Sequence, residues 1–183
     1  MAHRIVLSGG PGTGKTSVVN HLLSRDYLCF SEAFRHLLDE ENELNSGINF
    51  TNTPLEFSAR IYAQRLKQFQ AGAEHQLSFY DRSLVDVLAY LDFIKLESPQ
   101  NWIDQTKACQ YHQTVFHFPF WEEIYQQDEH RIESLEQAKA LDEIIQNAYL
   151  DRSYKLISVP FSSVESRADF ILNELKKINL INS

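Results

Sequence analysis

The strongest constraint on the fold of this chain is a glycine-rich loop close to its start. Residues 9–16 read GGPGTGKT and fit the pattern G-x-x-x-x-G-K-[ST] at every position. An apolar strand is predicted before the loop at residues 4–8, and a helix is predicted after it. The predicted helix carries four apolar side chains on one side: Val18, Val19, Leu22 and Leu23. A strand, this loop and a helix in succession are typical of a site that binds phosphate.

Each part of the loop suits the phosphates of a nucleotide. Glycine lets backbone N–H groups curve around phosphate oxygens, and the following helix directs the positive end of its dipole at the same anion. Lys15 would reach the β and γ phosphates, and Thr16 would offer its hydroxyl group to Mg²⁺. The predicted nucleotide-binding residues are Gly9, Gly10, Pro11, Gly12, Thr13, Gly14, Lys15, Thr16 and Ser17. The alternative is a glycine-rich turn with an exposed lysine.

The rest of the chain alternates short apolar strands with amphipathic helices. Four further strands are predicted, at residues 27–30, 76–80, 114–118 and 154–159. The helix predicted from Pro54 carries apolar side chains at spacings of four and three: Leu55, Ala59, Tyr62, Leu66 and Phe69. Further helices are predicted from residue 84, and at 101–111, 132–149 and 164–178. Because parallel strands need crossovers that return over the sheet, this alternation predicts an α/β fold, a three-layer sandwich with a five-stranded parallel sheet.

Length and composition fit one globular domain. The chain has 183 residues, of which 43% are hydrophobic and 23% charged, so it can bury a core without disulfides or a structural metal. We therefore expect a single domain over residues 1–183. A net charge of -8 argues against a broad nucleic-acid-binding surface, and the apolar start at residues 5–7 is too short for a signal peptide or a membrane span. These features favour a cytoplasmic protein that neither inserts into membranes nor binds nucleic acid.

An acidic residue ends the third predicted strand. Asp81 closes the run LSFYD, and parallel strands bring their carboxyl ends to one edge of the sheet. Asp81 would therefore lie near the phosphate loop and, with Thr16, hold Mg²⁺ and its water shell. Its alternative is a carboxylate that stabilises the first turn of a helix through the helix dipole. Ser83, with Asp86 three residues later, is expected to cap that helix rather than to act in catalysis.

Four segments together resemble a family of small AAA-type P-loop ATPases. They are the phosphate loop at 9–16, YDRSLVD at 80–86, FPFWEEIYQQD at 118–128 and SRADF at 166–170. That family is related to the nicotinamide riboside kinase domain of bacterial NAD-metabolism regulators and, more distantly, to nucleoside and nucleotide kinases. The resemblance covers almost the whole chain and implies a P-loop NTPase of the nucleoside and nucleotide kinase type.

The resemblance also implies roles for residues outside the loop. Asp81 and Arg82 match a pair in which the carboxylate serves the metal or the acceptor and the arginine faces phosphates. Glu32 matches an acidic residue that orients or deprotonates an acceptor hydroxyl group, although it could equally be a first-turn helix acid. Arg131 lies in an expected lid segment at about 120–134. There it would neutralise charge on the transferred phosphoryl group, or simply pair with a neighbouring glutamate.

An aromatic run at 117–121 ends the fourth predicted strand. Trp121 could stack on a base or shape the acceptor pocket, whereas packing in the core or at a lid hinge is the alternative. The predicted catalytic residues are Lys15, Glu32, Asp81 and Arg131. The predicted substrate contacts beyond the loop are Glu32, Arg82 and Trp121.

These residues favour a Mg²⁺-dependent kinase that transfers a phosphoryl group from ATP to a small, nucleoside-like hydroxyl acceptor. GTP is the less favoured nucleotide because no Asn-Lys-x-Asp-like guanine reader follows a late strand. Two alternatives stay open. One is a nucleotide-dependent switch or slow ATPase or GTPase with a regulatory or trafficking role, and the other is a metabolic regulator that binds nucleotide without turnover. We expect a monomer or a homodimer.

Overall fold

A five-stranded parallel sheet forms the centre of the molecule. The computed structural model describes residues 2–31, 37, 47–49, 51–125 and 134–181. The strands are β1 (His3–Ser8), β2 (Cys29–Phe30), β3 (Leu77–Asp81), β4 (Thr114–His117) and β5 (Lys155–Ser158). Their order across the sheet is β2-β3-β1-β4-β5, and every pairing is parallel. The predicted α/β class and the five-stranded parallel sheet are confirmed.

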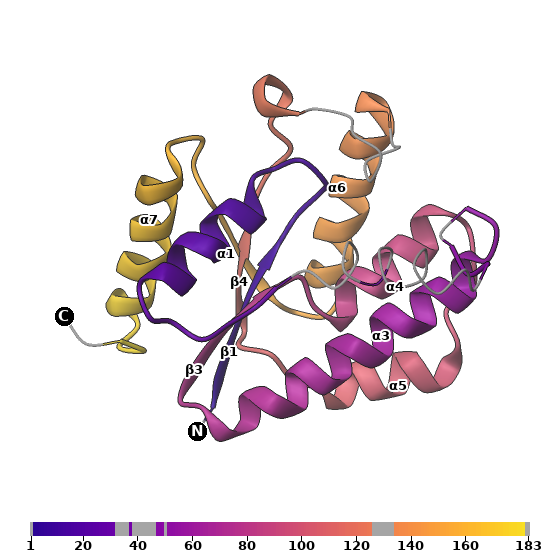
Figure 1. Cartoon of the computed structure of the whole chain (residues 1–183), viewed down its shortest axis with the longest axis horizontal. Helices are drawn as coiled ribbons and strands as arrows, with labels where there is room; N and C mark the ends of the chain where they lie inside the picture. Colours follow the sequence, from indigo (N-terminus) through magenta and orange to yellow (C-terminus); the bar gives the residue numbers. More distant parts are fainter. Residues whose placement is uncertain (1, 32–36, 38–46, 50, 126–133, 182–183) are drawn as a thin grey trace.

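Helices cover both faces of the sheet (Figure 1). They are α1 (Lys15–Ser24), α3 (Pro54–Ala71), α4 (Leu84–Phe93), α5 (Gln100–Ala108), α6 (Leu135–Leu150) and α7 (Val164–Lys177), with short 3₁₀ helices η1 (Gly72–Glu74) and η2 (Glu122–Ile124). α1 and α7 contact each other on one face, and α3, α4 and α6 pack together on the other. The predicted three layers are therefore present. Among the described helices, none is long and apolar enough to cross a membrane.

The alternation of side chains along the strands divides the core in two. Successive residues of β1 point to opposite faces, so Ile5 and Leu7 join one core and Val6 joins the other. The first core also contains Phe116 and the apolar sides of α1 and α7. The second contains Val115 and apolar residues of α3, α4 and α6. Because both faces of β1 are buried, the strand that leads into the phosphate loop is fixed from both sides.

Two apolar residues that the pattern placed on the buried faces of α1 and α3 are exposed to solvent. Leu23 on α1 is 54% exposed, and Leu55 on α3 is 43% exposed. α1 buries the preceding Leu22, and since each residue turns a helix by about 100°, the next side chain rotates outward. α3 buries Phe57, two positions after Leu55 and thus on the opposite side of the helix. The prediction was wrong for Leu23 and Leu55.

The sheet order brings the carboxyl ends of three strands together. In register, Leu7 of β1 lies opposite Asp81 of β3, and Ser8 lies opposite His117 of β4. The phosphate loop that leaves β1 therefore starts between the ends of β3 and β4. In open parallel sheets, this edge is where ligands bind.

α4 begins directly after β3 with the predicted cap. The Ser83 hydroxyl group accepts a hydrogen bond from the Val85 amide at 3.1 Å, and the Ser83 amide donates to Asp86 Oδ2 at 2.7 Å. This capping box satisfies backbone groups that the start of a helix leaves unpaired. The expected capping role of Ser83 is confirmed.

We expect the contact between α4 and α6 to contribute strongly to stability. Leu141→Ala removes a buried side chain from the second core and should lower the free energy of unfolding by about 2–5 kcal/mol. Leu150→Ala, at an exposed position of the same helix, should change it by less than about 0.5 kcal/mol. Chemical denaturation measures both values, and equal losses would contradict this assignment of the buried face.

Candidate nucleotide-binding site

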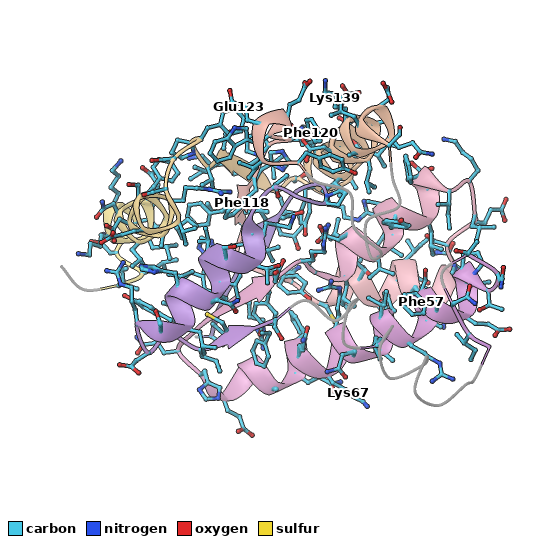
Figure 2. The ribbon with its side chains drawn as sticks, turned by 45° about the horizontal axis from the view of Figure 1, so that its top comes forward. Phe57, Lys67, Phe118, Phe120, Glu123 and Lys139 are labelled. Atoms are coloured by element: carbon cyan, nitrogen blue, oxygen red, sulfur yellow. The ribbon has the colours of Figure 1, made fainter. Side chains whose placement is uncertain are left out.

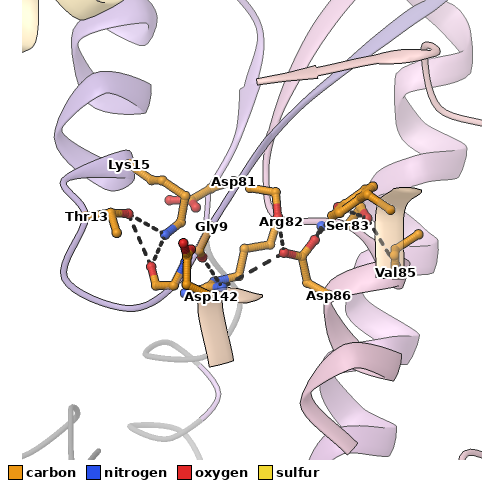
Figure 3. Close-up of polar contacts among 12 residues, drawn as sticks. Gly9, Thr13, Lys15, Asp81, Arg82, Ser83, Val85, Asp86 and Asp142 are labelled. Atoms are coloured by element: carbon orange, nitrogen blue, oxygen red, sulfur yellow. Dashed lines mark hydrogen bonds and ion pairs between the residues drawn. The ribbon is translucent and has the colours of Figure 1, made fainter. Parts of the chain in front are cut away.

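The phosphate loop closes around the ammonium group of Lys15, the first residue of α1 (Figure 3). Lys15 Nζ donates hydrogen bonds to Gly10 O at 2.5 Å and to Thr13 Oγ1 at 3.0 Å. The Thr13 hydroxyl group also donates to Gly10 O, at 3.2 Å. The Lys15 side chain is buried. A buried cation beside the N-terminus of a helix gives this loop a strong preference for an anion.

The structure brings Thr16 and Asp81 together, as the sequence led us to expect. The Thr16 hydroxyl group donates a hydrogen bond to Asp81 Oδ2 at 2.9 Å, and Asp81 is fully buried at the end of β3. Arg65 of α3, which the sequence did not single out, donates from Nη1 to the backbone oxygen of Asp81 at 2.8 Å. Because Arg65 is also buried, α3 places a positive charge next to the end of β3.

Arg82 contacts the loop from the turn between β3 and α4. Its Nη1 atom donates to Gly9 O at 2.8 Å and lies 4.0 Å from Asp86 Oδ1. The Arg82 backbone is left-handed, with φ 73°, which costs a residue with a side chain about 1–2 kcal/mol. Its amide donates to Leu7 O at 2.9 Å, and this bond helps to hold the conformation. The turn therefore keeps a strained arginine against the start of the loop.

A buried hydrogen-bond network holds the residue that precedes the loop. Ser8, the last residue of β1, donates from Oγ to Asp86 Oδ1 at 2.5 Å. Tyr149 of α6 donates its hydroxyl group to Asp86 Oδ2 at 2.5 Å and lies 2.6 Å from Ser83 Oγ. Burial and the Asp86 charge raise the pKa of Tyr149 well above its ordinary value, so it stays a hydrogen-bond donor. Besides capping α4, Asp86 thus ties Ser8 to α4 and α6.

A third buried carboxylate, which the sequence did not reveal, contacts the loop itself. Asp142 of α6 accepts hydrogen bonds from Gly10 N at 2.8 Å and from Phe120 N at 3.3 Å. Its other side-chain contacts are His117 Nε2 and Gln146 Nε2, both at 3.2 Å. Burial raises the pKa of Asp142, but the His117 contact and the two backbone amides outweigh burial, so the net pKa lies below its ordinary value. Asp142 is therefore an ionised carboxylate at neutral pH.

Arg167 of α7 holds another side of the loop. Its Nη2 atom donates to Thr13 O at 2.6 Å, and its guanidinium carbon lies 4.6 Å from the centre of the Phe118 ring. Burial lowers the pKa of Arg167 to about 10. The centre of the Trp121 ring lies 4.9 Å from that of Phe161 and 5.7 Å from the Arg167 guanidinium. Trp121 therefore belongs to the α7 side of the loop.

The connection that leaves β4 lies across the loop. Tyr125 is so close to Gly12 that a Cβ atom added there would come within 2.7 Å of its ring. The Lys139 ammonium group of α6 donates to Glu122 Oε2 of this connection at 3.0 Å, and Figure 2 shows Phe120 near Lys139. The Lys139 ammonium group lies 5.5 Å from the centre of the Phe120 ring. The connection thus contacts both the loop and the start of α6.

Two of the predicted residues fall outside the described part of the chain. Glu32 and Arg131 are not among the described residues, nor are residues 126–133 of the expected lid segment. Ser17, the last predicted nucleotide contact, lies exposed beside Thr16 in the first turn of α1. The other predicted residues gather at the edge where β1, β3 and β4 end.

The residues that the sequence analysis missed share one signal. Arg65, Asp142 and Arg167 are charged side chains on the buried faces of α3, α6 and α7. An amphipathic helix normally keeps such residues on its polar side, because a buried charge is costly unless it is paired. A check of each predicted apolar face for a charged residue would have found all three.

Comparison with known proteins identifies the family of this chain. A family model described as an AAA domain matches residues 4–167, which is most of the chain. The chain belongs to this AAA domain family. No curated protein sequence matches this AAA-domain chain.

Solved structures with the same fold include kinases of nucleosides and nucleotides. The NadR protein in complex with NR matches with a TM-score of 0.72 and 16% identity, over 99% of this chain and 52% of that chain. Deoxyadenosine kinase from M. mycoides, with products dCMP and a flexible dCDP bound, matches with a TM-score of 0.71 and 15% identity, over 95% and 99% of the two chains. Thymidylate kinase from Candida albicans matches with a TM-score of 0.62 and 14% identity, over 100% of this chain and 96% of that chain. The AAA-domain chain therefore has the P-loop NTPase fold of these kinases, as its resemblance implied.

We expect the geometry of the loop to require glycine at position 9. Gly9 has φ 137°, and a Cβ atom there would come within 2.2 Å of the backbone oxygen of Phe118. Gly9→Ala should lower the free energy of unfolding by more than about 2 kcal/mol, because the alanine must displace the backbone that follows β4.

The matched control for this prediction is Gly47→Ala. Gly47 also has a left-handed backbone, with φ 73°, and the described residues place no atom within 4 Å of the added Cβ. Its substitution should cost only about 1–2 kcal/mol of backbone strain. Equal losses in the two variants, measured by denaturation, would contradict the close approach of Gly9 to Phe118.

Proposed function

We propose that this AAA-domain protein is a Mg²⁺-dependent phosphotransferase that transfers the γ-phosphoryl group of ATP to a hydroxyl group of a small, nucleoside-like acceptor. The observation that carries the proposal is the contact between Thr16 and Asp81 beside the buried ammonium group of Lys15. Phosphoryl transfer depends mainly on positioning and charge stabilisation. A phosphate loop, a fixed cation and a hydroxyl–carboxylate pair supply both.

The side-chain oxygens of Thr16 and Asp81 suit Mg²⁺. This cation prefers oxygen ligands and is commonly held by one or two carboxylates together with phosphate oxygens and water. Within the described part of the chain there is no group of three or more His, Cys, Asp or Glu side chains that could hold a metal ion by itself. A cation here would complete its shell with nucleotide phosphates, and when bound it would offset their negative charge.

Lys15 would move from the oxygens of the loop to those of the nucleotide. Its ammonium group bonds to Gly10 O and Thr13 Oγ1, and phosphate oxygens are stronger acceptors because they are charged. Arg82, which donates to Gly9 O, is a second cation at the loop. Together the two cations would stabilise negative charge as it shifts from the γ-phosphoryl group to the departing ADP.

The transfer step needs an acceptor oxygen in line with the γ phosphorus. The acceptor hydroxyl oxygen forms the new P–O bond, the bond from the γ phosphorus to ADP breaks, and the hydroxyl proton passes to a base. On the resemblance to nucleoside kinases, we assign the role of that base to Glu32. We assign to Arg131 the role of neutralising the charge on the transferred phosphoryl group. Likeness to structures that hold NR or dCMP supports a nucleoside-like acceptor.

The first test is an ADP-release assay with a panel of acceptors. Pure protein is incubated with Mg²⁺ and ATP, alone and with nucleosides that include nicotinamide riboside and deoxynucleosides, and GTP is tried in parallel. We expect one acceptor class to stimulate ADP release, and Lys15→Ala to reduce the stimulated rate at least about 100-fold. Lys177→Ala, at an exposed position of α7, is the control and should keep the rate.

The outcomes separate two functions. Stimulated ADP release that depends on Lys15 supports the kinase and identifies its acceptor class. Tight, Lys15-dependent nucleotide binding without stimulation by any acceptor would count against kinase action on the panel and favour the nucleotide-dependent switch.

We also propose that Trp121, beside Arg167 and Phe161, lies at the site of the nucleotide base. The only other tryptophan is Trp102, which stacks on Tyr62 at 4.6 Å between ring centres. ATP should therefore change the intrinsic fluorescence of the wild type and of Trp102→Phe, but not that of Trp121→Phe. Trp121→Ala should weaken ATP binding by about 1–3 kcal/mol, the range for one aromatic stack on a base. If ATP still changes the fluorescence of Trp121→Phe, the nucleotide base does not lie at Trp121.

A further inference from the structure

We propose that Asp142 is a positioning residue for the phosphate loop and that it couples the loop to the connection leaving β4. This inference rests on the proposed nucleotide-binding function of the loop. Asp142 joins the Gly10 amide on one side to the His117 ring and the Phe120 amide on the other.

The two oxygens of one carboxylate divide between these partners. Oδ1 of Asp142 accepts from Gly10 N at 2.8 Å, inside the loop. Oδ2 accepts from Phe120 N at 3.3 Å and contacts His117 Nε2 and Gln146 Nε2 at 3.2 Å each. A displacement of the connection that leaves β4 therefore acts on the Asp142 carboxylate, which also holds the Gly10 amide of the loop.

Packing alone does not explain a carboxylate at this position. Asp142 lies on the buried face of α6, where a charge is costly unless hydrogen bonds compensate for lost water. An apolar side chain would fill the space but would leave the Gly10 amide without this acceptor. α6 approaches the loop closely here, since a Cβ atom on Gly10 would lie 3.3 Å from Ala138 O and 3.4 Å from Asp142 Cβ.

Gly10 links Asp142 to the place where phosphate would bind. The Gly10 amide donates to Asp142 at 2.8 Å, and the Gly10 carbonyl oxygen accepts from Lys15 Nζ at 2.5 Å. The orientation of Gly10 therefore sets both the path of the backbone at the start of the loop and the position of the Lys15 ammonium group. Without the carboxylate, Gly10 can rotate, and Lys15 loses a fixed acceptor.

The side chains that anchor the two preceding residues lie at the turn between β3 and α4, although Tyr149 of α6 also binds one of them, Asp86. Ser8 is bound by Asp86 and Gly9 by Arg82, and both anchors lie near the turn between β3 and α4. Asp142 belongs to α6, which follows the connection that lies across the loop. Within the described residues, Asp142 is the one of these three side chains that accepts a hydrogen bond from the connection itself, through the Phe120 amide.

The test compares Asp142→Asn with Glu143→Gln. Asparagine has the same shape and can still accept from Gly10 N, but its NH₂ group faces the Phe120 amide, where the carboxylate accepted a hydrogen bond. Glu143 is the next residue of α6, is exposed, and loses the same charge in its variant. We expect the dissociation constant for ATP, measured by calorimetry, to rise about tenfold in Asp142→Asn and to stay unchanged in Glu143→Gln.

Hydrogen exchange with inorganic triphosphate distinguishes coupling from simple stabilisation. This probe occupies a phosphate loop but has no base that could contact Trp121. In the wild type, saturating triphosphate with Mg²⁺ should slow amide exchange in residues 9–16 and also in residues 118–125. In Asp142→Asn, we expect residues 9–16 to stay protected and the protection of 118–125 to be lost. Equal protection of 118–125 in variant and wild type overturns the proposal.

His117 provides a second test should Asp142→Asn fail to fold. His117→Gln keeps an N–H donor for the carboxylate and should retain the protection of 118–125, whereas His117→Ala should lose it. Where Asp142→Asn does fold, the double variant of Asp142→Asn and His117→Ala should lose no more ATP affinity than Asp142→Asn alone, because both changes break one connection. If the losses of ATP affinity in the two single variants add fully in the double variant, the proposed link between Asp142 and His117 is overturned.

These measurements distinguish failure of the proposed nucleotide-binding function from failure of the role of Asp142. If the wild type binds neither ATP nor triphosphate, the proposed function fails and this inference fails with it. If the wild type binds both, and Asp142→Asn matches it in affinity and in protection, only the role of Asp142 is refuted.

Discussion

The buried ammonium group of Lys15 is the charge around which this edge of the sheet is organised. A cation removed from water is stable in a protein only when acceptors and opposite charges surround it. Backbone and hydroxyl oxygens of the loop accept hydrogen bonds from the Lys15 ammonium group. The buried carboxylates of Asp81, Asp86 and Asp142 lie at the same edge, so the region is rich in negative charge as well as in donors.

These three carboxylates each bind a different point of the loop or its flanks. Asp81 accepts from Thr16, and Asp86 and Asp142 accept from the residues just before and within the loop. The acceptors come from β3, α4 and α6, so three elements of the fold share the task. A loop held in this way needs little rearrangement to receive an anion, and such preorganisation is a main source of electrostatic stabilisation in enzymes.

Much of the fold could be predicted because it depends on local spacing. The loop pattern, the alternation of strands and helices, and the place of Asp81 at a strand end all follow from short stretches of sequence. The contact of Asp142 with Gly10 could not be predicted in this way, because it spans 132 positions and depends on how α6 packs. Leu23 shows the limit of periodicity itself, since one residue of error in phase turns a side chain from the core to the solvent.

The roles of Glu32 and Arg131 stay predictions, because both lie outside the described residues. They rest on resemblance alone, whereas the roles proposed for Lys15, Thr16 and Asp81 also rest on contacts within the structure. Contacts within the structure therefore support the nucleotide half of the proposed reaction, and likeness to nucleoside kinases supports the acceptor half.

The central place of β1 in the sheet also affects how the chain folds. β1 pairs with residues 77–81 on one side and 115–117 on the other. Pairings between segments so distant in the chain form slowly, because a long loop must close before they are gained. The phosphate loop can thus take its shape only in molecules that have completed the sheet. A nucleotide bound there would select those molecules and shift the folding equilibrium by mass action, so that cellular nucleotide levels would set how much of a weakened variant stays folded.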